Sequence, residues 1–276
     1  GYLPLYVGII LMLLLACYLS LYVSLFAAGL VYFRDKIPLY LTAPVLWVCF
    51  EYGKSFFLTG FPWENLGYSQ YLNRYLIQSA DVVGVFGLSF ILLLVNATIF
   101  EVISKKSKKE YIVAGCVFLV IVSVLVYGVY RVNHVNQILR SAKGLDVYLV
   151  QGNIEQAIKW DKKYKKETLD IYERLSLKHA PDNGSLIVWP ETAVPFKFQV
   201  MNDLHEQIVH LSVKTKSWLL FGSVSSLPYP GGHEFFNSAY LLSPSGDVRG
   251  KYDKVHLVPY GEYVPLRNVM PFVEGF

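Results

Sequence analysis

The sequence predicts a membrane-embedded all-α bundle followed by an α/β domain, and three observations lead to this fold class. The chain has 276 residues, of which 54% are hydrophobic and 17% charged, and its mean hydropathy of +0.37 is too high for an ordinary soluble domain. The long apolar runs are concentrated in residues 1–130, whereas residues 144–276 have the composition of a water-soluble domain. Within that second part, apolar strands alternate with helical segments, which favours a layered α/β domain with a buried sheet.

Four apolar segments predict transmembrane helices. They are residues 3–33, 38–58, 82–103 and 111–130. The second segment is interrupted by Glu51 and Lys54, which are three positions apart and therefore share one helix face. Ionisable groups inside a span usually pair or line a cavity, so these two residues form either an ion pair at the interface end of the helix or part of a functional site.

The charges of the loops predict how the helices are oriented. Arg34–Lys36 and Lys105–Lys109 are basic and flank alternate spans, while the loop between them, residues 59–81, carries a single arginine. Basic loops remain in the cytoplasm, and four crossings then place everything after residue 130 outside it. A polar linker at residues 131–143 is expected to lead into a domain at residues 144–276.

The loop Thr59–Tyr75, which includes Trp63, is rich in glycine, proline, tryptophan and tyrosine. One interpretation is an aromatic belt at the level of the lipid headgroups. The other is a re-entrant element that guides lipid towards the outer domain.

The outer domain is predicted to contain strands and helices in alternation. The strands are expected at Leu145–Asn153, Ser185–Glu191, Trp218–Val224 and Phe235–Ser243, and the helices at Asp161–His179 and Met201–Lys216. Catalytic groups in such folds lie where strands run out into loops. The ends of these strands are therefore the places to look for chemistry.

Glu191 follows a buried strand in the segment SLIVWPETAVP, Ser185–Pro195. A carboxylate at this position commonly caps the next turn. However, Pro190 and Pro195 fix φ on either side of it, which restricts the side chain more than a cap requires. The apolar strand also partly removes the carboxylate from water, which makes it a stronger base. Glu191 is therefore our candidate for a general base.

The segment KYDKVHLVPYGEYVP, Lys251–Pro265, offers partners for that base. Lys254 beside a carboxylate could stabilise a developing oxyanion, and Glu262 is a second carboxylate in the same segment. Each could instead be a solvated surface charge, which is the interpretation we prefer for His256.

We expect neither a metal site nor a cofactor. HEQIVH, His205–His210, resembles the zinc-binding pattern HExxH, but its histidines are five positions apart rather than four and so lie on different helix faces. The lysines form short runs rather than one basic face, which argues against a nucleic-acid partner. The three cysteines, Cys17, Cys49 and Cys116, lie within apolar runs, where a thiol is unreactive.

Four segments, in this order after membrane spans, resemble bacterial apolipoprotein N-acyltransferase. They are TGFPWENLGYSQ, VQGNIEQAIKW, VWPETAVP and FFNSAYLLSPSGDVRGKYDKVHLVPYGEYVP. The resemblance implies a nitrilase-like domain, an αββα sandwich, that is incomplete at the C-terminus of this chain. The chain begins with Gly1 rather than methionine and has fewer spans than the family, so we expect it to be truncated at both ends.

The resemblance also implies roles for individual residues. Glu191 would be the general base, Lys254 would stabilise the tetrahedral intermediate, and Glu262 would be a supporting glutamate. Trp160 would lie near the substrate path, and we take Trp63 and Tyr260 as further substrate-binding candidates. The family's cysteine nucleophile would lie beyond residue 276, so this chain alone is expected to be inactive.

The implied reaction is acyl transfer through a thioester acyl-enzyme, with a phospholipid as donor and a diacylglyceryl-apolipoprotein as acceptor. It would take place at the bacterial inner membrane, with the nitrilase-like domain on the periplasmic side. Two alternatives remain open, namely a membrane-tethered carbon–nitrogen hydrolase and a non-catalytic nitrilase-like scaffold.

Overall fold

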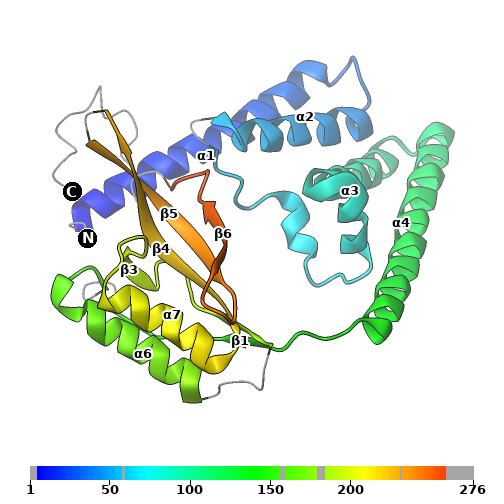
Figure 1. The fold of residues 1–276 in the computed structure, drawn as a ribbon. Coiled ribbons are helices and arrows are strands. Elements are labelled where there is room, and N and C mark those ends of the chain that lie inside the picture. Colours follow the sequence, from blue (N-terminus) through cyan, green and yellow to red (C-terminus); the bar gives the residue numbers. More distant parts are fainter. Residues whose placement is uncertain (1–4, 58–59, 156–158, 179–183, 231, 259–276) are drawn as a thin grey trace. The chain divides into compact units, whose positions relative to one another are not determined.

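The computed structural model describes residues 5–57, 60–155, 159–178, 184–230 and 232–258. These residues form two compact units, which divide between Ala142 and Lys143. The first unit is helical, and the second is built on a mixed β-sheet (Figure 1).

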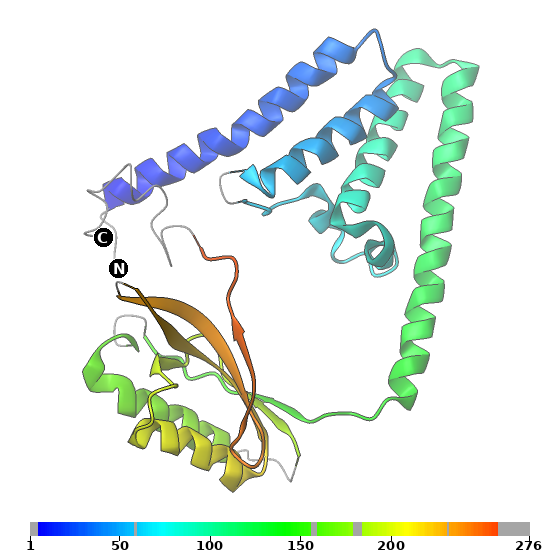
Figure 2. The same cartoon turned by 45° about the horizontal axis from the view of Figure 1, so that its top comes forward.

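The helical unit contains four α-helices: α1 (Leu5–Phe33), α2 (Leu39–Lys54), α3 (Ala80–Lys105) and α4 (Lys108–Ser141). Helix α2 packs against α1 and α3, and α3 packs against α4 (Figure 2). Two short 3₁₀ helices, η2 (Leu66–Gln70) and η3 (Leu76–Ser79), lie in the connection between α2 and α3. Gly84, with φ of 64° and ψ of −176°, kinks α3 near its start.

Three helical segments of the described chain are long and apolar enough to cross a membrane: Leu5–Phe33, Leu76–Lys105 and Lys108–Ser141. The predicted second span is a helix of 16 residues, about 24 Å long at 1.5 Å per residue, which is shorter than the segment 38–58 that we expected. Helix α4 continues to Ser141 through most of the predicted linker. Residues 131–141 contain neither glycine nor proline, so no residue there ends the helix.

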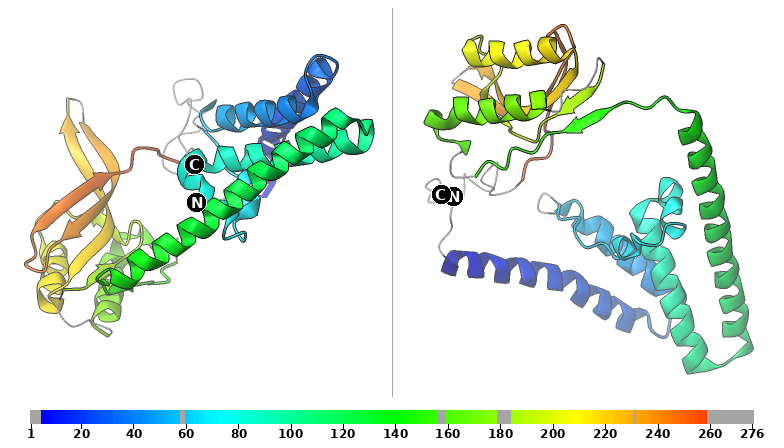
Figure 3. Two further views of the ribbon diagram at one scale, coloured as in Figure 1. Left: turned by 90° about the vertical axis from the view of Figure 1, so that its right-hand side faces the viewer. Right: turned by 90° about the horizontal axis from the view of Figure 1, so that it is seen from below.

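The second unit has a sheet in the order β1-β2-β4-β5-β6, with β3 pairing with β4. The strands are β1 (Val147–Leu149), β2 (Leu186–Val188), β3 (Val194–Lys197), β4 (Trp218–Tyr229), β5 (Gly232–Leu242) and β6 (Val248–Asp253). β1, β2 and β4 pair in parallel, as do β3 and β4, whereas β4, β5 and β6 pair antiparallel. The β4–β5 hairpin extends beyond the two helices of this unit (Figure 3).

Those two helices, α6 (Lys165–Lys178) and α7 (Asp203–Thr215), cover one face of the sheet (Figure 1). A one-turn 3₁₀ helix, η4 (Lys162–Tyr164), precedes α6. Asn202 caps α7, because its side chain accepts hydrogen bonds from the backbone N–H groups of Leu204 and His205. The core lies between this helical layer and the sheet.

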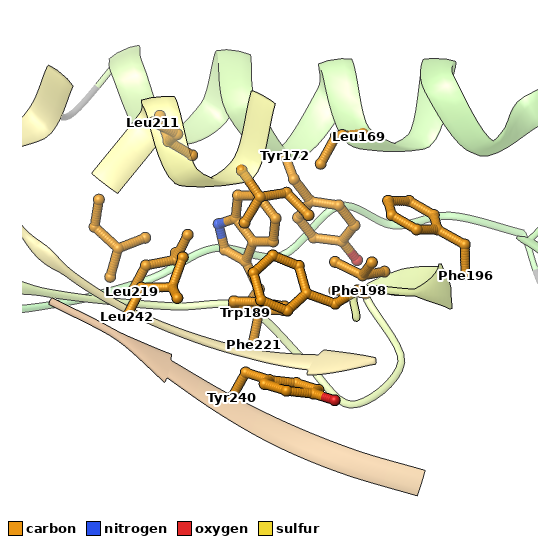
Figure 4. Packing of buried hydrophobic residues seen from close by; sticks show 14 residues of the cluster. Leu169, Tyr172, Trp189, Phe196, Phe198, Leu211, Leu219, Phe221, Tyr240 and Leu242 are labelled. Carbon is orange, nitrogen blue, oxygen red and sulfur yellow. The ribbon is translucent and has the colours of Figure 1, made fainter. Parts of the chain in front are cut away.

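Aromatic rings form the centre of that core (Figure 4). Trp189 stacks on Tyr172 of α6 with ring centroids 5.1 Å apart, and its indole N–H donates to the buried Ser176 hydroxyl at 2.9 Å. Phe198 and Phe221 pack edge to face beside them. Trp189 immediately follows β2, so this packing fixes the place at which the chain leaves the sheet.

Candidate active site

Glu191 lies in a tight turn directly after the anchored Trp189. The backbone N–H of Trp189 donates to the carbonyl of Leu220 at 2.8 Å, and that of Ala193 donates to the carbonyl of Pro190 at 3.1 Å. Thr192 has a positive φ of 53°, which is uncommon outside glycine. The chain then enters β3, whose Pro195 is buried. The proline-braced strand exit that the sequence predicts is therefore a turn between β2 and β3.

A glycine on the neighbouring strand makes room for this turn. A Cβ atom on Gly222 of β4 would lie 2.4 Å from the backbone nitrogen of Thr192 and 2.8 Å from the Cα of Glu191. Neither atom belongs to a movable side chain. The backbone of Glu191 can approach β4 this closely because position 222 lacks a side chain.

Lys254, the predicted partner of Glu191, immediately follows β6. Its backbone N–H donates to the carbonyl of Asn237 at 2.8 Å. Its Nζ lies 3.1 Å from Oε1 of Glu191, and the two side chains are 30% and 62% exposed, respectively. The structure therefore brings together two residues that are 63 positions apart in sequence. The exposed fraction of Glu191 shows that the described residues do not remove its carboxylate from water as we had expected.

Asn237 of β5 is a third member of the site, and sequence reasoning missed it. Its side-chain amide donates to Oε1 of Glu191 at 2.5 Å. An asparagine is unfavourable in a strand, and its position within the mostly apolar and aromatic stretch FFNSAYLL is the signal that could have singled it out.

Lys159 is a second residue that sequence reasoning missed. Its Nζ donates to the backbone carbonyl of Glu191 at 3.2 Å. Burial lowers the pKa of this lysine, and the nearby Glu191 carboxylate opposes part of that effect. A cation next to a lysine-rich run would ordinarily be assigned to a solvated surface, so the sequence carried no clear signal for it.

A hydroxyl and carboxylate network fixes the end of β6 beside Lys254. Asp253 accepts a hydrogen bond from Ser238 at 2.5 Å and pairs with Lys251 at 2.9 Å, while Ser238 also bonds to Ser225 at 2.6 Å. Burial raises the pKa of Asp253, but the Ser238 hydroxyl and the Lys251 ammonium outweigh it and hold that pKa below its usual value.

The remaining predicted site residues have different outcomes. Trp160 is 52% exposed and lines a surface hollow of about 520 Å³ together with Lys165, Lys197 and Asn202. Tyr260 and Glu262 lie outside the described residues. His256 is exposed, in agreement with the solvated interpretation.

Trp63 belongs to the helical unit, where two side chains of α2 hold its loop. Lys54 Nζ donates to the backbone carbonyl of Trp63 at 2.8 Å. The buried Glu51 accepts from the backbone N–H of Leu66 at 2.6 Å and from the indole of Trp47 at 2.7 Å. Glu51 and Lys54 thus bind the loop rather than each other, and with Trp63 they line a cavity of about 240 Å³.

The arrangement around Glu191 provides a carboxylate that can accept a proton and a cation that can stabilise negative charge on a substrate oxygen. These two groups are the minimum for acyl chemistry once a nucleophile is present.

Comparison with known proteins identifies the class of this domain and then the proteins to which the whole chain is similar. Residues 147–273 match the carbon–nitrogen hydrolase family model, so the sheet domain with its Glu191–Lys254 pair is a domain of that class. Residues 1–98 match the model of the apolipoprotein N-acyltransferase N-terminal domain. The chain is similar to apolipoprotein N-acyltransferases over nearly its whole length.

Individual relatives show the extent of this similarity. Over 99% of its length the chain is 41% identical to the apolipoprotein N-acyltransferase of Geobacter metallireducens, of which it covers 53%. It is 32% identical over 93% of its length to that of Haemophilus influenzae, of which it covers 49%. The chain thus spans about half the length of the curated relatives it matches. A crystal structure of a carbon–nitrogen hydrolase from Helicobacter pylori G27 aligns with 43% of this chain and 42% of its own, at 23% identity and a TM-score of 0.31.

Proposed function

We propose that the complete protein containing this chain acts as an apolipoprotein N-acyltransferase. It would move an acyl chain from a membrane phospholipid to the N-terminal diacylglyceryl-cysteine of an apolipoprotein. The observation that carries the proposal is the 3.1 Å contact between Glu191 and Lys254 in a carbon–nitrogen hydrolase domain that is joined to apolar helices. The names of the relatives support the substrate class.

In the first proposed step, a cysteine thiol attacks the acyl ester of the phospholipid. Glu191 takes the thiol proton as the C–S bond forms, and the Lys254 ammonium stabilises the oxygen that becomes negative. The ester C–O bond then breaks, and Glu191 returns the proton to the departing lysophospholipid oxygen, which leaves a thioester. The sequence has no cysteine after Cys116, so the thiol would come from a part of the complete protein outside this chain.

In the second proposed step, the α-amino group of the acceptor attacks the thioester. Glu191 takes one proton from the amine as the C–N bond forms, and Lys254 again stabilises the oxyanion. The C–S bond breaks, the thiolate leaves, and the proton returns to it from Glu191. The products are the amide and the free thiol, so the same two residues serve both steps.

The other predicted residues would support substrate binding. Trp160, Trp63 and Tyr260 would contact the lipid chains, and Glu262 would assist the base. Lysines of the run Trp160–Lys166 would meet anionic headgroups at about 1 kcal/mol each.

The proposed location is the bacterial inner membrane, with the carbon–nitrogen hydrolase domain on the periplasmic side. Arg34 and Lys105, from the two basic loops, line one common hollow of the helical unit, which supports placing both loops on the same side of the membrane. Helix α2 runs antiparallel to α3, because its first N–H bonds to Glu101 near the end of α3. Even at 16 residues, α2 therefore returns the chain across the unit (Figure 2).

The test uses the complete protein in membranes that contain phospholipid with a radiolabelled acyl chain. We expect wild-type protein to form a labelled thioester that hydroxylamine or an acceptor lipopeptide releases. We expect Glu191→Gln to reduce its rate of formation by about 100-fold to 10,000-fold, the range that removal of a catalytic base typically costs. Wild-type thioester formation by Glu191→Gln would overturn the assignment of the base.

The same experiment separates the alternatives. A membrane-tethered amidase would cleave a small amide but leave the labelled phospholipid intact and the protein unlabelled. A scaffold would neither cleave the amide nor acquire the label. Either result would overturn the proposed acyl transfer.

A further inference from the structure

Asn237 contacts both members of the Glu191–Lys254 pair. Its side-chain amide donates to Oε1 of Glu191, and its backbone carbonyl accepts the N–H of Lys254 at 2.8 Å. Lys254 Nζ meets the same Oε1 at 3.1 Å. One residue of β5 therefore fixes the carboxylate through its side chain and the start of the lysine through its main chain.

We infer that Asn237 is a positioning residue for acyl transfer, which holds Oε1 of Glu191 against Lys254 so that Oε2 is directed to the proton that moves. This inference rests on the proposed roles of Glu191 and Lys254. Among the described residues, the side-chain contacts of Glu191 converge on Oε1, so Oε2 is left for the reacting groups.

A neutral donor suits this task better than a second cation. A carboxylate that is 62% exposed and that pairs, within the described part of the chain, with one ammonium can exchange its two oxygens by rotation about its last bond. A second fixed donor on the same oxygen removes that freedom. Because the amide carries no charge, it stabilises the ionised carboxylate less than another lysine would, and the carboxylate remains able to accept a proton.

The strand register places Asn237 beside the turn that contains Glu191. Asn237 pairs with Val224 of β4, two residues beyond Gly222, and Gly222 is the residue against which the backbone of Glu191 packs. The β4–β5 hairpin thus contacts Glu191 at two nearby positions: Gly222 contacts its backbone and Asn237 its carboxylate.

The experiment measures thioester formation by the complete protein as a function of pH in single-turnover conditions. Asn237→Leu keeps the shape of the side chain and removes the donor, whereas Asn237→Asp keeps the shape and adds a negative charge. The matched control is Gln207→Met, because Gln207 of α7 donates its amide to Asp170 of α6, the same kind of bond away from the site. Glu191→Gln is measured in parallel.

We expect Asn237→Leu to slow thioester formation by about 10-fold to 100-fold, as for a hydrogen bond to a charged group. The acid limb of the pH–rate profile should rise by about one pH unit, because a carboxylate that has lost a donor holds its proton more tightly. Asn237→Asp should raise that limb further. Gln207→Met should leave both rate and acid limb unchanged.

The outcomes distinguish this inference from the function on which it rests. If Glu191→Gln is inactive while Asn237→Leu and Asn237→Asp both retain the wild-type rate and acid limb, Asn237 has no positioning role. If Glu191→Gln is itself fully active, the proposed base is wrong. If Asn237→Leu is slower but its acid limb is unchanged, the loss of rate reflects a general loss of structure, and this result would also refute the inference. Asn237→Asp has the same shape as the native residue and supplies a second measurement if the leucine variant fails to fold.

Discussion

The backbone of Glu191 is positioned by the absence of a side chain at Gly222. The gap between β4 and the turn is too small for a methyl group, since a Cβ there would meet two backbone atoms at 2.4 and 2.8 Å. Thr192 holds the turn in a left-handed conformation that a β-branched residue adopts at a cost. The surrounding packing around Trp189 therefore has to maintain this turn.

We predict that Gly222→Ala will impair both the fold and the chemistry. Accommodating the methyl group should cost about 1–3 kcal/mol of unfolding free energy. The accompanying displacement of Glu191 should lower the rate of thioester formation by about 100-fold, as a misplacement of 1 Å can. Thermal unfolding and single-turnover kinetics of the complete protein measure the two effects.

Gly250→Ala in β6 is the control for this substitution. A Cβ on Gly250 would have its nearest contact at 3.8 Å, with the Cβ of Leu241, so a methyl group fits there. A Gly222→Ala protein as active and stable as the Gly250→Ala protein would show that the close approach does not position the glutamate.

The sequence was sufficient to predict part of this site. Glu191 could be singled out because it leaves an apolar strand between prolines, and Lys254 because it is a charged residue amid apolar and aromatic residues after the predicted sheet. The structure brings the two into contact. Asn237, Gly222 and Lys159 could not be found in this way. Their roles depend on which residues face one another across paired strands or a loop, and a single sequence does not specify that register.

Among the helices, the start of α2 shows how an apolar helix is capped from outside. Its N-cap residue is Pro38, which makes no side-chain cap hydrogen bond. Instead, Oε1 of Glu101, a residue of α3 that is 3% exposed, accepts the N–H of Leu39 at 2.8 Å. The same oxygen pairs with Lys105 at 2.9 Å. One buried carboxylate thus satisfies a free donor of α2 and joins it to α3.

We predict that Glu101→Leu will destabilise the helical unit more than Glu101→Gln or Lys105→Met. The leucine leaves the N–H of Leu39 without its partner, at a cost of about 1–3 kcal/mol, whereas glutamine keeps an acceptor oxygen. Lys105→Met removes only the half-exposed ammonium that pairs with Glu101, and it leaves the hydrogen bond to Leu39 in place. The midpoint of thermal unfolding of each variant in detergent, followed by size-exclusion chromatography, ranks the variants by stability. Equal midpoints for Glu101→Leu and Lys105→Met would contradict the capping role of Glu101.

Some helices and strands were predicted correctly from the sequence and others were missed, and each outcome has a physical reason. The apolar runs and the alternating segments were found because hydrophobicity and periodicity report them directly. β3 was missed because it contains Pro195, a residue that normally argues against a strand, and β6 because its sequence, VRGKYD, is polar. Helix α4 was predicted to end at residue 130 because the apolar run stops there, but a helix can continue into water wherever no residue breaks it.

The protein as a whole is proposed to have both basic loops in the cytoplasm and its carbon–nitrogen hydrolase domain outside. This arrangement follows from loop charge, and the common hollow lined by Arg34 and Lys105 supports the placement of the two loops on one side.

Cysteine labelling tests this topology. In a complete protein whose native cysteines are replaced by serine, except any needed for folding, Lys36→Cys, Lys106→Cys and Lys143→Cys are introduced singly. We expect a membrane-impermeant maleimide to label the protein at position 143 in intact spheroplasts, and at positions 36 and 106 only after the membrane is permeabilised. The reverse pattern would show that the domain is cytoplasmic.

The β4–β5 hairpin, which supplies both Gly222 and Asn237, also makes assembly of the candidate site depend on strand register. A slip of β5 by one residue against β4 would reverse which side chains point to each face of the sheet, and Phe236 or Ser238 would replace the asparagine opposite Val224. A sheet paired in this wrong register would still contain Glu191 and Lys254 but would lack the amide that contacts Glu191. Correct pairing of these two strands is therefore a condition for the proposed acyl transfer.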